Sequence, residues 1–192
     1  MIFSSLNFCS PRTHNQPVEP RFCLNGKTGV TIFVKSDERT MKEHETFTRE
    51  AILLAANARK KGNAPFGALL ARHGEIILRA ENTVVSGKNP TQHAEMNLIQ
   101  LAWSSLDANV IRDATLYTST EPCPMCTGAI FWSEIRCVVF SVSAKAQAEM
   151  AHDRFTVSCV PLLQRANYEI KVIGPVLEQE GLIVHKGFWQ SE

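Results

Sequence analysis

The sequence predicts an α/β protein built as a three-layer α/β/α sandwich around a mixed five-stranded sheet. Apolar residues recur at helical spacing from Phe47 to Ala58, and Gly62 follows as a helix stop. Two apolar runs then flank His73-Gly74, a pair typical of a tight hairpin turn. Beyond this hairpin, apolar strand-like runs alternate with helical segments, and this pattern places helices on both faces of one sheet.

The later elements follow from local signals in chain order. Pro90-Thr91 opens a helix after a polar loop, because proline suits the first turn of a helix. Pro124 opens a shorter helix in the same way, and the run CVVFSV that follows is rich in the β-branched residues of strands. We expect strands at 66–71, 75–80, 114–118, 137–142 and 169–173, and helices from 42, from 90, over 124–132, between the last two strands, and over 178–185.

Composition limits the classes of function. The chain has 192 residues, of which 44% are hydrophobic, so it can bury a full core. Its formal net charge of +1 gives no strong electrostatic attraction to nucleic acid or membrane, and no apolar run reaches the length of a membrane-spanning helix. The six cysteines lack the density of a secreted disulfide scaffold. These features favour a cytoplasmic protein without a membrane partner.

The first 40 residues differ from the rest. Prolines and polar residues mix without a sustained period between Asn7 and Asn25. We therefore expect residues 1–40 to form a poorly ordered N-terminal extension and residues 41–192 to form one domain. The low acidity of the first residues also permits an organellar targeting segment, and Met41 is an alternative start. Within the extension, the apolar run from Gly29 to Lys35 could add a short edge strand.

Two short motifs supply the residues of a catalytic zinc site. His93-Ala94-Glu95 opens one predicted helix, and Cys123-Pro-Met-Cys126 opens another about 30 residues later. A catalytic zinc takes three protein ligands and keeps one position for water. His93, Cys123 and Cys126 provide these three ligands for one zinc per chain, and helix N-termini favour the thiolate forms of the cysteines.

Glu95 is the expected proton carrier of this site. In the middle of a helix, an offset of two residues would turn Glu95 away from His93. In a first turn with the metal beyond the helix end, both side chains can reach the metal. Zinc lowers the pKa of water from 15.7 toward about 7 in favourable sites. Glu95 would then carry a proton from this water to the substrate and on to the leaving amine.

Other interpretations of these residues are open at this stage. A Cys-x-x-Cys pair at a strand-to-helix junction is also the motif of a thiol-disulfide oxidoreductase, although this leaves His93-Ala94-Glu95 unexplained. A structural zinc site would require a fourth protein ligand, for which Cys137 and Cys159 are available. A binding protein that keeps the fold without activity is a further alternative, but it would not need Glu95.

The segment from about Thr46 to Phe140 resembles the cytidine-deaminase-like zinc deaminases. The resemblance is strongest to the branch that holds guanine deaminases, cytosine deaminases and tRNA adenosine deaminases. It rests on motifs in the same order and at the same spacing, namely Pro65-Phe66-Gly67, Asn82, Pro90-Thr91-Gln92-His93-Ala94-Glu95 and Glu121-Pro122-Cys123-Pro124-Met125-Cys126-Thr127-Gly128-Ala129-Ile130. The resemblance implies a cytidine deaminase-like fold and hydrolytic release of ammonia from a nucleobase.

The resemblance also implies substrate contacts. Asn82 would hydrogen-bond the base, and backbone groups near Gly67, Ala68 and Ala94 would hold its edge. Phe66 would form a wall of the pocket. We expect Glu121, in contrast, to brace the helix that follows it rather than to touch substrate.

The C-terminal residues are further candidates. Two large aromatic residues, Phe188 and Trp189, are costly to expose, so they pack against the body of the protein or cap the pocket. Asp153 is also a candidate for substrate binding, because guanine deaminases carry an acidic pair in this region. Only one acid is present here, which weakens the argument for guanine. Two further tryptophans, Trp103 and Trp132, fall at core-like helical positions and are expected to pack.

The expected substrate is a small nucleobase or nucleoside, with guanine first. Cytosine is the second choice, and the wobble adenosine of tRNA is the third. An RNA substrate would require clustered lysine and arginine. The tail from Gly174 onward instead has one lysine, Lys186, against three glutamates, Glu178, Glu180 and Glu192. Nucleic acid is therefore disfavoured as a partner. The helical face left over after assembly of the zinc site favours a homodimer.

Overall fold

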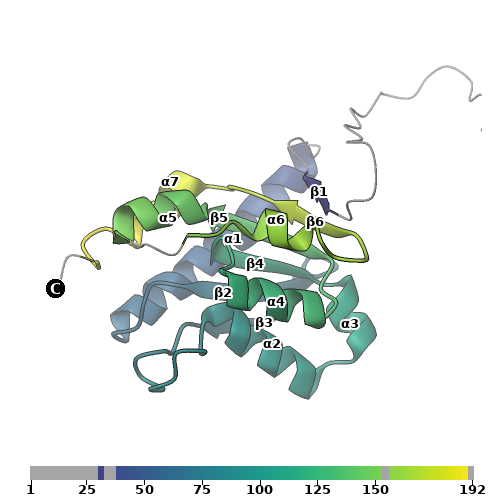
Figure 1. Cartoon of the computed structure of the whole chain (residues 1–192), viewed down its shortest axis with the longest axis horizontal. Helices are drawn as coiled ribbons and strands as arrows, with labels where there is room; N and C mark the ends of the chain where they lie inside the picture. Colours follow the sequence, from purple (N-terminus) through teal and green to yellow (C-terminus); the bar gives the residue numbers. More distant parts are fainter. Residues whose placement is uncertain (1–29, 33–37, 153–155, 190–192) are drawn as a thin grey trace, which may run out of the picture.

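A computed structural model describes residues 30–32, 38–152 and 156–189 of the chain. Figure 1 labels their elements, and the bounds follow in chain order. They are β1 (Val30–Ile32), α1 (Glu38–Lys60), β2 (Gly67–Arg72), β3 (Glu75–Glu81), α2 (Ala94–Ser105), α3 (Ala108–Asp113), β4 (Thr115–Thr120), α4 (Pro124–Trp132), β5 (Cys137–Val142), α5 (Ala144–Ala151), α6 (Cys159–Leu163), β6 (Ile170–Ile173) and α7 (Glu178–Ile183).

The strands form one mixed sheet in the order β1-β6-β5-β4-β2-β3. Strands β4, β5, β6 and β1 are parallel, whereas β2 pairs antiparallel with both β3 and β4. The five predicted strands are all present. Residues 30–32 add a sixth strand at the edge of the sheet, within the segment expected to form an edge strand.

The hairpin turn lies at the predicted position. His73 and Gly74 both have positive φ, at 54° and 79°. This backbone matches a two-residue turn of the type that follows the right-handed twist of the flanking strands. The turn pairs Arg72 with Glu75, and a bulge between Leu70 and Ala71 shifts the register by one residue, so that Gly67 at the start of β2 pairs with Glu81 at the end of β3. The beginning of β2 and the end of β3 therefore lie at the same edge of the sheet.

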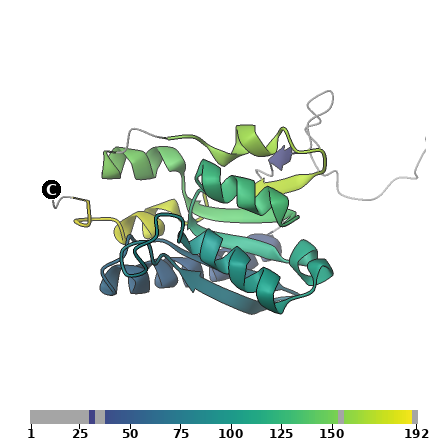
Figure 2. The ribbon, with the colours of Figure 1, turned by 60° about the horizontal axis from the view of Figure 1, so that its bottom comes forward.

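Helices cover both faces of the sheet, as predicted (Figure 2). On one face, α2, α4 and α6 pack Leu98, Ile130 and Leu163 into a cluster with alternate strand residues such as Leu70 and Val138. On the other face, α1 contributes Phe47 and Ala51 to a second cluster with Leu69, Tyr117 and Val139. The alternation along β2, β4, β5 and β6 divides their residues between the two clusters, as a sheet buried on both faces requires.

Three details differ from the predictions. The helix expected to begin at Pro90 begins at Ala94, because Asn89 Oδ1 accepts hydrogen bonds from Thr91 N–H and Thr91 Oγ1 and holds a turn there. The connection between β5 and β6 holds two helices, α5 and α6, and α3 precedes β4. The prediction that Trp103 and Trp132 pack in the core is wrong, since these side chains are 57% and 78% exposed.

The predicted N-terminal extension lies largely outside the described residues. Residues 1–29 and 33–37 of it are not described, and helix α1 begins at Glu38, before the boundary expected at residue 40. The division of the chain at residue 40 thus stays a prediction. Among the described helices, none combines the length and the apolar character needed to cross a lipid bilayer.

Candidate active site

The sheet brings the sequence motifs to one edge. Phe66 precedes β2, and Asn82 follows β3, its antiparallel partner. The run from Glu121 to Cys126 follows β4, which is antiparallel to β2, so the end of β4 lies beside the start of β2. Helices α2 and α4 both begin at this edge and pack on the same face of the sheet. Binding sites commonly form outside the carboxyl ends of parallel strands, and this edge fits that rule.

His93 and Cys123 occupy equivalent positions, each as the N-cap of its helix. Both have extended backbones, with ψ of 159° and 169°, and neither side chain caps its own helix. The side chains are therefore free to point beyond the helix ends. Pro124 follows Cys123 at the start of α4, where it needs no hydrogen-bond donor. Cys126 then returns to the same side of the helix three residues later.

The three ligand atoms form a nearly equilateral triangle. Cys123 Sγ and Cys126 Sγ lie 3.6 Å apart, and each lies 3.6 Å from His93 Nδ1. Tetrahedral zinc, with Zn–S bonds of about 2.3 Å and a Zn–N bond of about 2.0–2.1 Å, separates such ligands by about 3.6–3.8 Å. The triangle thus fits zinc, and these three residues would hold it.

No fourth protein ligand joins this group among the described residues, which include Cys137 and Cys159. A structural zinc site is normally closed by four protein ligands. Three ligands instead match a catalytic site, in which water or substrate takes the remaining position.

The environment favours a charged ligand at Cys123. The hydrogen bond between Cys123 and Cys126, together with the one between Cys123 and His93, lowers the pKa of Cys123 to about 4. In turn, the hydrogen bond to Cys123 raises the pKa of His93. The helix N-terminus adds to the stabilisation of a thiolate here.

Glu95 lies beside this triangle and is almost fully buried. It is the second residue of α2, 6% exposed, and its Oε2 lies 3.6 Å from Cys126 Sγ. Its other oxygen, Oε1, accepts a hydrogen bond of 2.9 Å from Thr118 Oγ1 on β4. Burial raises the pKa of Glu95 above its ordinary value. A buried, oriented carboxyl group of this kind suits proton transfer near neutral pH.

A cavity of about 540 Å³ opens onto these groups. Its size is typical of small-molecule sites. It is lined by Phe66, His93, Glu95, Thr120, Cys123, Pro124, Ala144, Gln147, Ala151, His152, Thr156, Val157 and Trp189.

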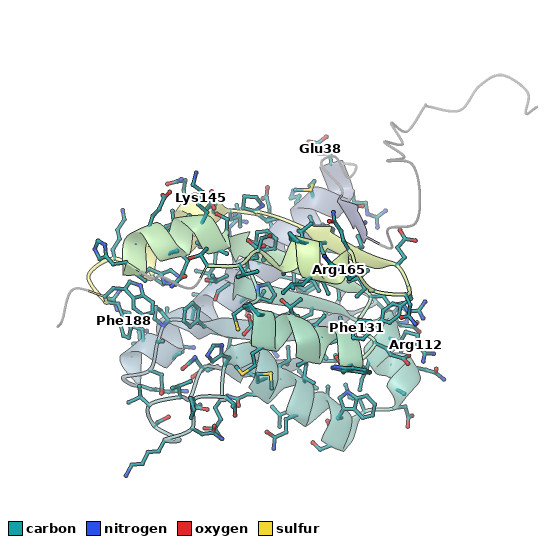
Figure 3. The ribbon with its side chains drawn as sticks, in the orientation of Figure 1. Glu38, Arg112, Phe131, Lys145, Arg165 and Phe188 are labelled. Atoms are coloured by element: carbon teal, nitrogen blue, oxygen red, sulfur yellow. The ribbon has the colours of Figure 1, made fainter. Side chains whose placement is uncertain are left out.

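Two of the predicted pocket residues, Phe66 and Trp189, line the cavity with their rings 6.1 Å apart. Phe188 packs edge-on against Trp189 and beneath the Arg59 guanidinium instead. Figure 3 shows Phe188 at the end of the molecule where α5 also lies. Asp153 lies outside the described residues.

The other predicted substrate contacts differ in whether the structure leaves them free to meet a ligand. Asn82 is buried, and its Oδ1 accepts from Val84 N–H, so only its Nδ2 group is without a partner among the described residues. Ala94 opens α2, where its N–H has no intrahelical acceptor. Gly67 and Ala68, in contrast, are absent from the cavity lining. Gly67 N–H donates to Ser119 Oγ, and a Cβ there would lie 2.5 Å from Ala51 O, so Gly67 allows α1 to pack closely.

Several residues of the site carry no sequence signal of their own. Thr118 and Thr120 belong to a strand in which alternate residues face α2, so their register could have identified them. His185 is fully buried, and its Nε2 lies 3.4 Å from Thr120 Oγ1. Burial lowers the pKa of His185 to about 4, so this ring is neutral at pH 7. Gln147 lies on α5, a helix with no fully buried residue, and His152 is the C-cap of this helix.

Comparison with known proteins places this site in a family. Residues 41–142 match the family model described as the cytidine and deoxycytidylate deaminase zinc-binding region. The chain belongs to this family. It is therefore a zinc-dependent deaminase, a hydrolase that acts on C–N bonds. The zinc-binding region contains the triangle of His93, Cys123 and Cys126, and the comparisons give no support to the oxidoreductase interpretation.

Relatives of this deaminase differ in their substrates. The probable cytosine deaminase of Schizosaccharomyces pombe is 39% identical over 76% of this chain and 91% of its own length. The guanine deaminase of Bacillus subtilis is 40% identical over 57% of this chain and 71% of its own length. A solved structure from a study of tRNA:A34 deaminases has a TM-score of 0.60 and is 25% identical, covering 72% of this chain and 98% of the other.

Substitution of Cys123 tests the metal site. Cys123→Ala should reduce the zinc content from about one per chain to near zero. It should also lower the midpoint of thermal unfolding, because the metal joins the ends of α2 and α4. Mass spectrometry of the purified protein measures the metal, and Cys137→Ala, a cysteine outside the triangle, is the matched control. Stoichiometric zinc in Cys123→Ala would contradict this ligand set.

Proposed function

We propose that this deaminase hydrolyses the exocyclic amine of a free nucleobase or nucleoside, with guanine as the first candidate. The observation that carries the proposal is the position of Glu95. Its carboxylate lies beside the zinc ligands and faces a cavity with aromatic walls. Hydrolytic deamination requires this combination of a metal site, a proton carrier and a surface on which a base can stack.

Glu95 performs the proton transfers in this scheme. Zinc, when bound, supplies a water molecule of lowered pKa as the nucleophile. Glu95 accepts a proton as water adds to the amidine carbon of the base, and it delivers this proton to the neighbouring ring nitrogen. It then takes the proton of the new hydroxyl group and passes it to the amine, which leaves as ammonia, so that a C=O group replaces C–NH₂. The hydrogen bond from Thr118 keeps the carboxylate oriented through these steps.

The charges around the cavity favour a small substrate over RNA. Among the described residues that line it, there is no lysine or arginine. Contacts to a phosphate backbone depend on such residues. The chain as a whole carries a formal net charge of only +1. These features support a free base or nucleoside.

The choice of base rests on similarity and cavity size. The B. subtilis guanine deaminase is 40% identical to this chain, and a cavity of about 540 Å³ is ample for a purine. Cytosine is the second candidate, because the S. pombe relative matches over 91% of its length.

A screen of ammonia release from guanine, cytosine, adenine, their nucleosides and a tRNA anticodon stem-loop distinguishes the candidates. Release from the stem-loop alone would refute the small-substrate proposal.

Replacement of the proton carrier provides the sharpest test of the chemistry. Glu95→Gln should lower kcat by about 10²–10⁴-fold with zinc retained, because the amide keeps the shape but cannot carry the proton. Turnover of the best substrate and metal content are both measured. A Glu95→Gln enzyme that works at the wild-type rate would rule out this role.

Trp189 should act by stacking on the base. Its ring lies near Phe66 and is nearly parallel to that of His185, at an interplanar angle of 13°. Trp189→Ala should raise KM about tenfold with a small effect on kcat, since stacking on an aromatic residue contributes about 1–3 kcal/mol per base. Trp189→Phe should largely restore KM. Steady-state kinetics of the two variants provide the test, and an unchanged KM in Trp189→Ala would assign the ring to packing.

We also infer that the deaminase is a cytoplasmic homodimer. Helices α2 and α4 carry three exposed apolar side chains, Leu101, Trp103 and Trp132. Exposed tryptophans are unusual on a surface that faces only solvent, and they are common at interfaces. Trp132→Glu should shift the protein toward the monomer in sedimentation velocity runs. Lys145→Glu, at an exposed position on α5, is the control, and a wild-type monomer would disprove the inference.

A further inference from the structure

Helix α5 forms one wall of the active-site cavity, and its residues are at most partly buried. Ala144, Gln147 and Ala151 line the cavity, and no residue of α5 is fully buried. Figure 3 shows Lys145 extending from this helix to the surface. A helix of eight residues without a buried apolar stripe gains little from packing. Its position must therefore be set by other contacts.

A buried carboxylate provides one of these contacts. Glu121 lies between the end of β4 and Cys123 and is 9% exposed. Its Oε2 accepts a hydrogen bond of 2.9 Å from the N–H of Ala144, the first residue of α5. Its Oε1 accepts from Ser158 Oγ at 2.6 Å and from Cys159 N–H at 2.9 Å, at the start of α6. One side chain thus holds the first turns of two helices.

This arrangement corrects the expectation that Glu121 braces the helix that follows it. The helix that follows is α4, whereas the hydrogen bonds of Glu121 go to α5 and α6. The first N–H groups of a helix have no intrahelical acceptor, and a carboxylate satisfies them strongly. Glu121 is therefore well placed to fix helices that lack apolar anchors.

A second carboxylate holds the residue just before α5. Glu178 Oε1, at the start of α7, accepts from Ser143 N–H at 3.0 Å and from Ser143 Oγ at 2.6 Å. This contact ties α5 to the C-terminal segment that carries Trp189. Glu121 differs from Glu178 in one respect, because it is only two residues from a zinc ligand. It connects the wall of the cavity directly to the metal loop, the run from Glu121 to Cys126 that carries two of the zinc ligands.

We propose that Glu121 is a positioning residue that sets the distance between the α5 wall and the reacting centre. Through α5 it places Gln147, whose amide has no hydrogen-bond partner among the described residues and faces the cavity. The Gln147 amide is then available to read the polar edge of the substrate. This role rests on the proposed deaminase function, since it concerns how the substrate is held beside Glu95.

Kinetics of Glu121→Gln test the proposal. The amide keeps the shape of the side chain, but an NH₂ group replaces one of the two carboxylate oxygens. The backbone N–H that this oxygen accepted from, at the start of α5 or of α6, then has no acceptor. KM for the best substrate should rise about tenfold, with kcat and zinc content little changed. Amide hydrogen exchange should become faster in α5 and remain unchanged in α2 and α4. Glu134→Gln, which alters only a surface ion pair with Arg112, is the matched control.

A second variant isolates the bond to α5. Ala144→Pro replaces the N–H that donates to Glu121 with a ring carbon, which also pushes the carboxylate away from α5, at a first helical position where proline is tolerated. The preceding residue, Ser143, has φ of −67° and ψ of 150°, a conformation compatible with a following proline. This variant should reproduce the higher KM and the faster exchange in α5, even where Glu121→Gln fails to fold.

The outcomes separate this proposal from the proposed function. Loss of zinc, or a fall in kcat at constant KM, would assign Glu121 to the metal loop and overturn the proposal. Wild-type KM and exchange in both variants would also overturn it. If the wild type released no ammonia from any substrate, the proposed function would fail. Hydrogen exchange in α5 would still decide whether Glu121 holds the wall.

Discussion

The site depends on two helix ends held together at one edge of the sheet. His93 and Cys123 are the N-caps of α2 and α4, and Cys126 follows in the first turn of α4. Metal coordination tolerates errors of about 0.2 Å, so the packing of Leu98 and Ile130 against the strands is a precondition of the chemistry. The core therefore fixes the spacing of 3.6 Å between the ligand atoms.

The same burial that forms the core also defines the role of Glu95. A carboxyl group enclosed by α2, β4 and the metal loop loses solvation, which raises its pKa. Thr118 offsets part of this cost with one hydrogen bond and fixes the orientation of the group. Because Thr118 belongs to β4, the proton carrier is supported by a strand that is hydrogen-bonded on both sides, to β5 and to β2.

Local signals explain which features could be predicted from the sequence. The hairpin rests on two residues, His73 and Gly74, that tolerate positive φ, and the metal ligands rest on short, fixed spacings. The exposure of Trp132 could not be predicted, because α4 is apolar on nearly every side and its sequence does not single out the side that meets the core. The double hydrogen bonding of Glu121 depends on residues 23 and 38 positions away, which no local pattern reveals.

The residues that line the cavity come from two parts of the chain. The region that matches the family model ends at residue 142, immediately before α5. It contains the zinc ligands and Glu95, whereas Gln147, His152 and Trp189 of the cavity lie beyond it. The relatives named as a probable cytosine deaminase and a guanine deaminase match over 153 and 111 residues. Because the hydrogen bonds of Glu121 and Glu178 hold the start of α5, substitutions in this helix can change the cavity wall while the reacting centre keeps its geometry.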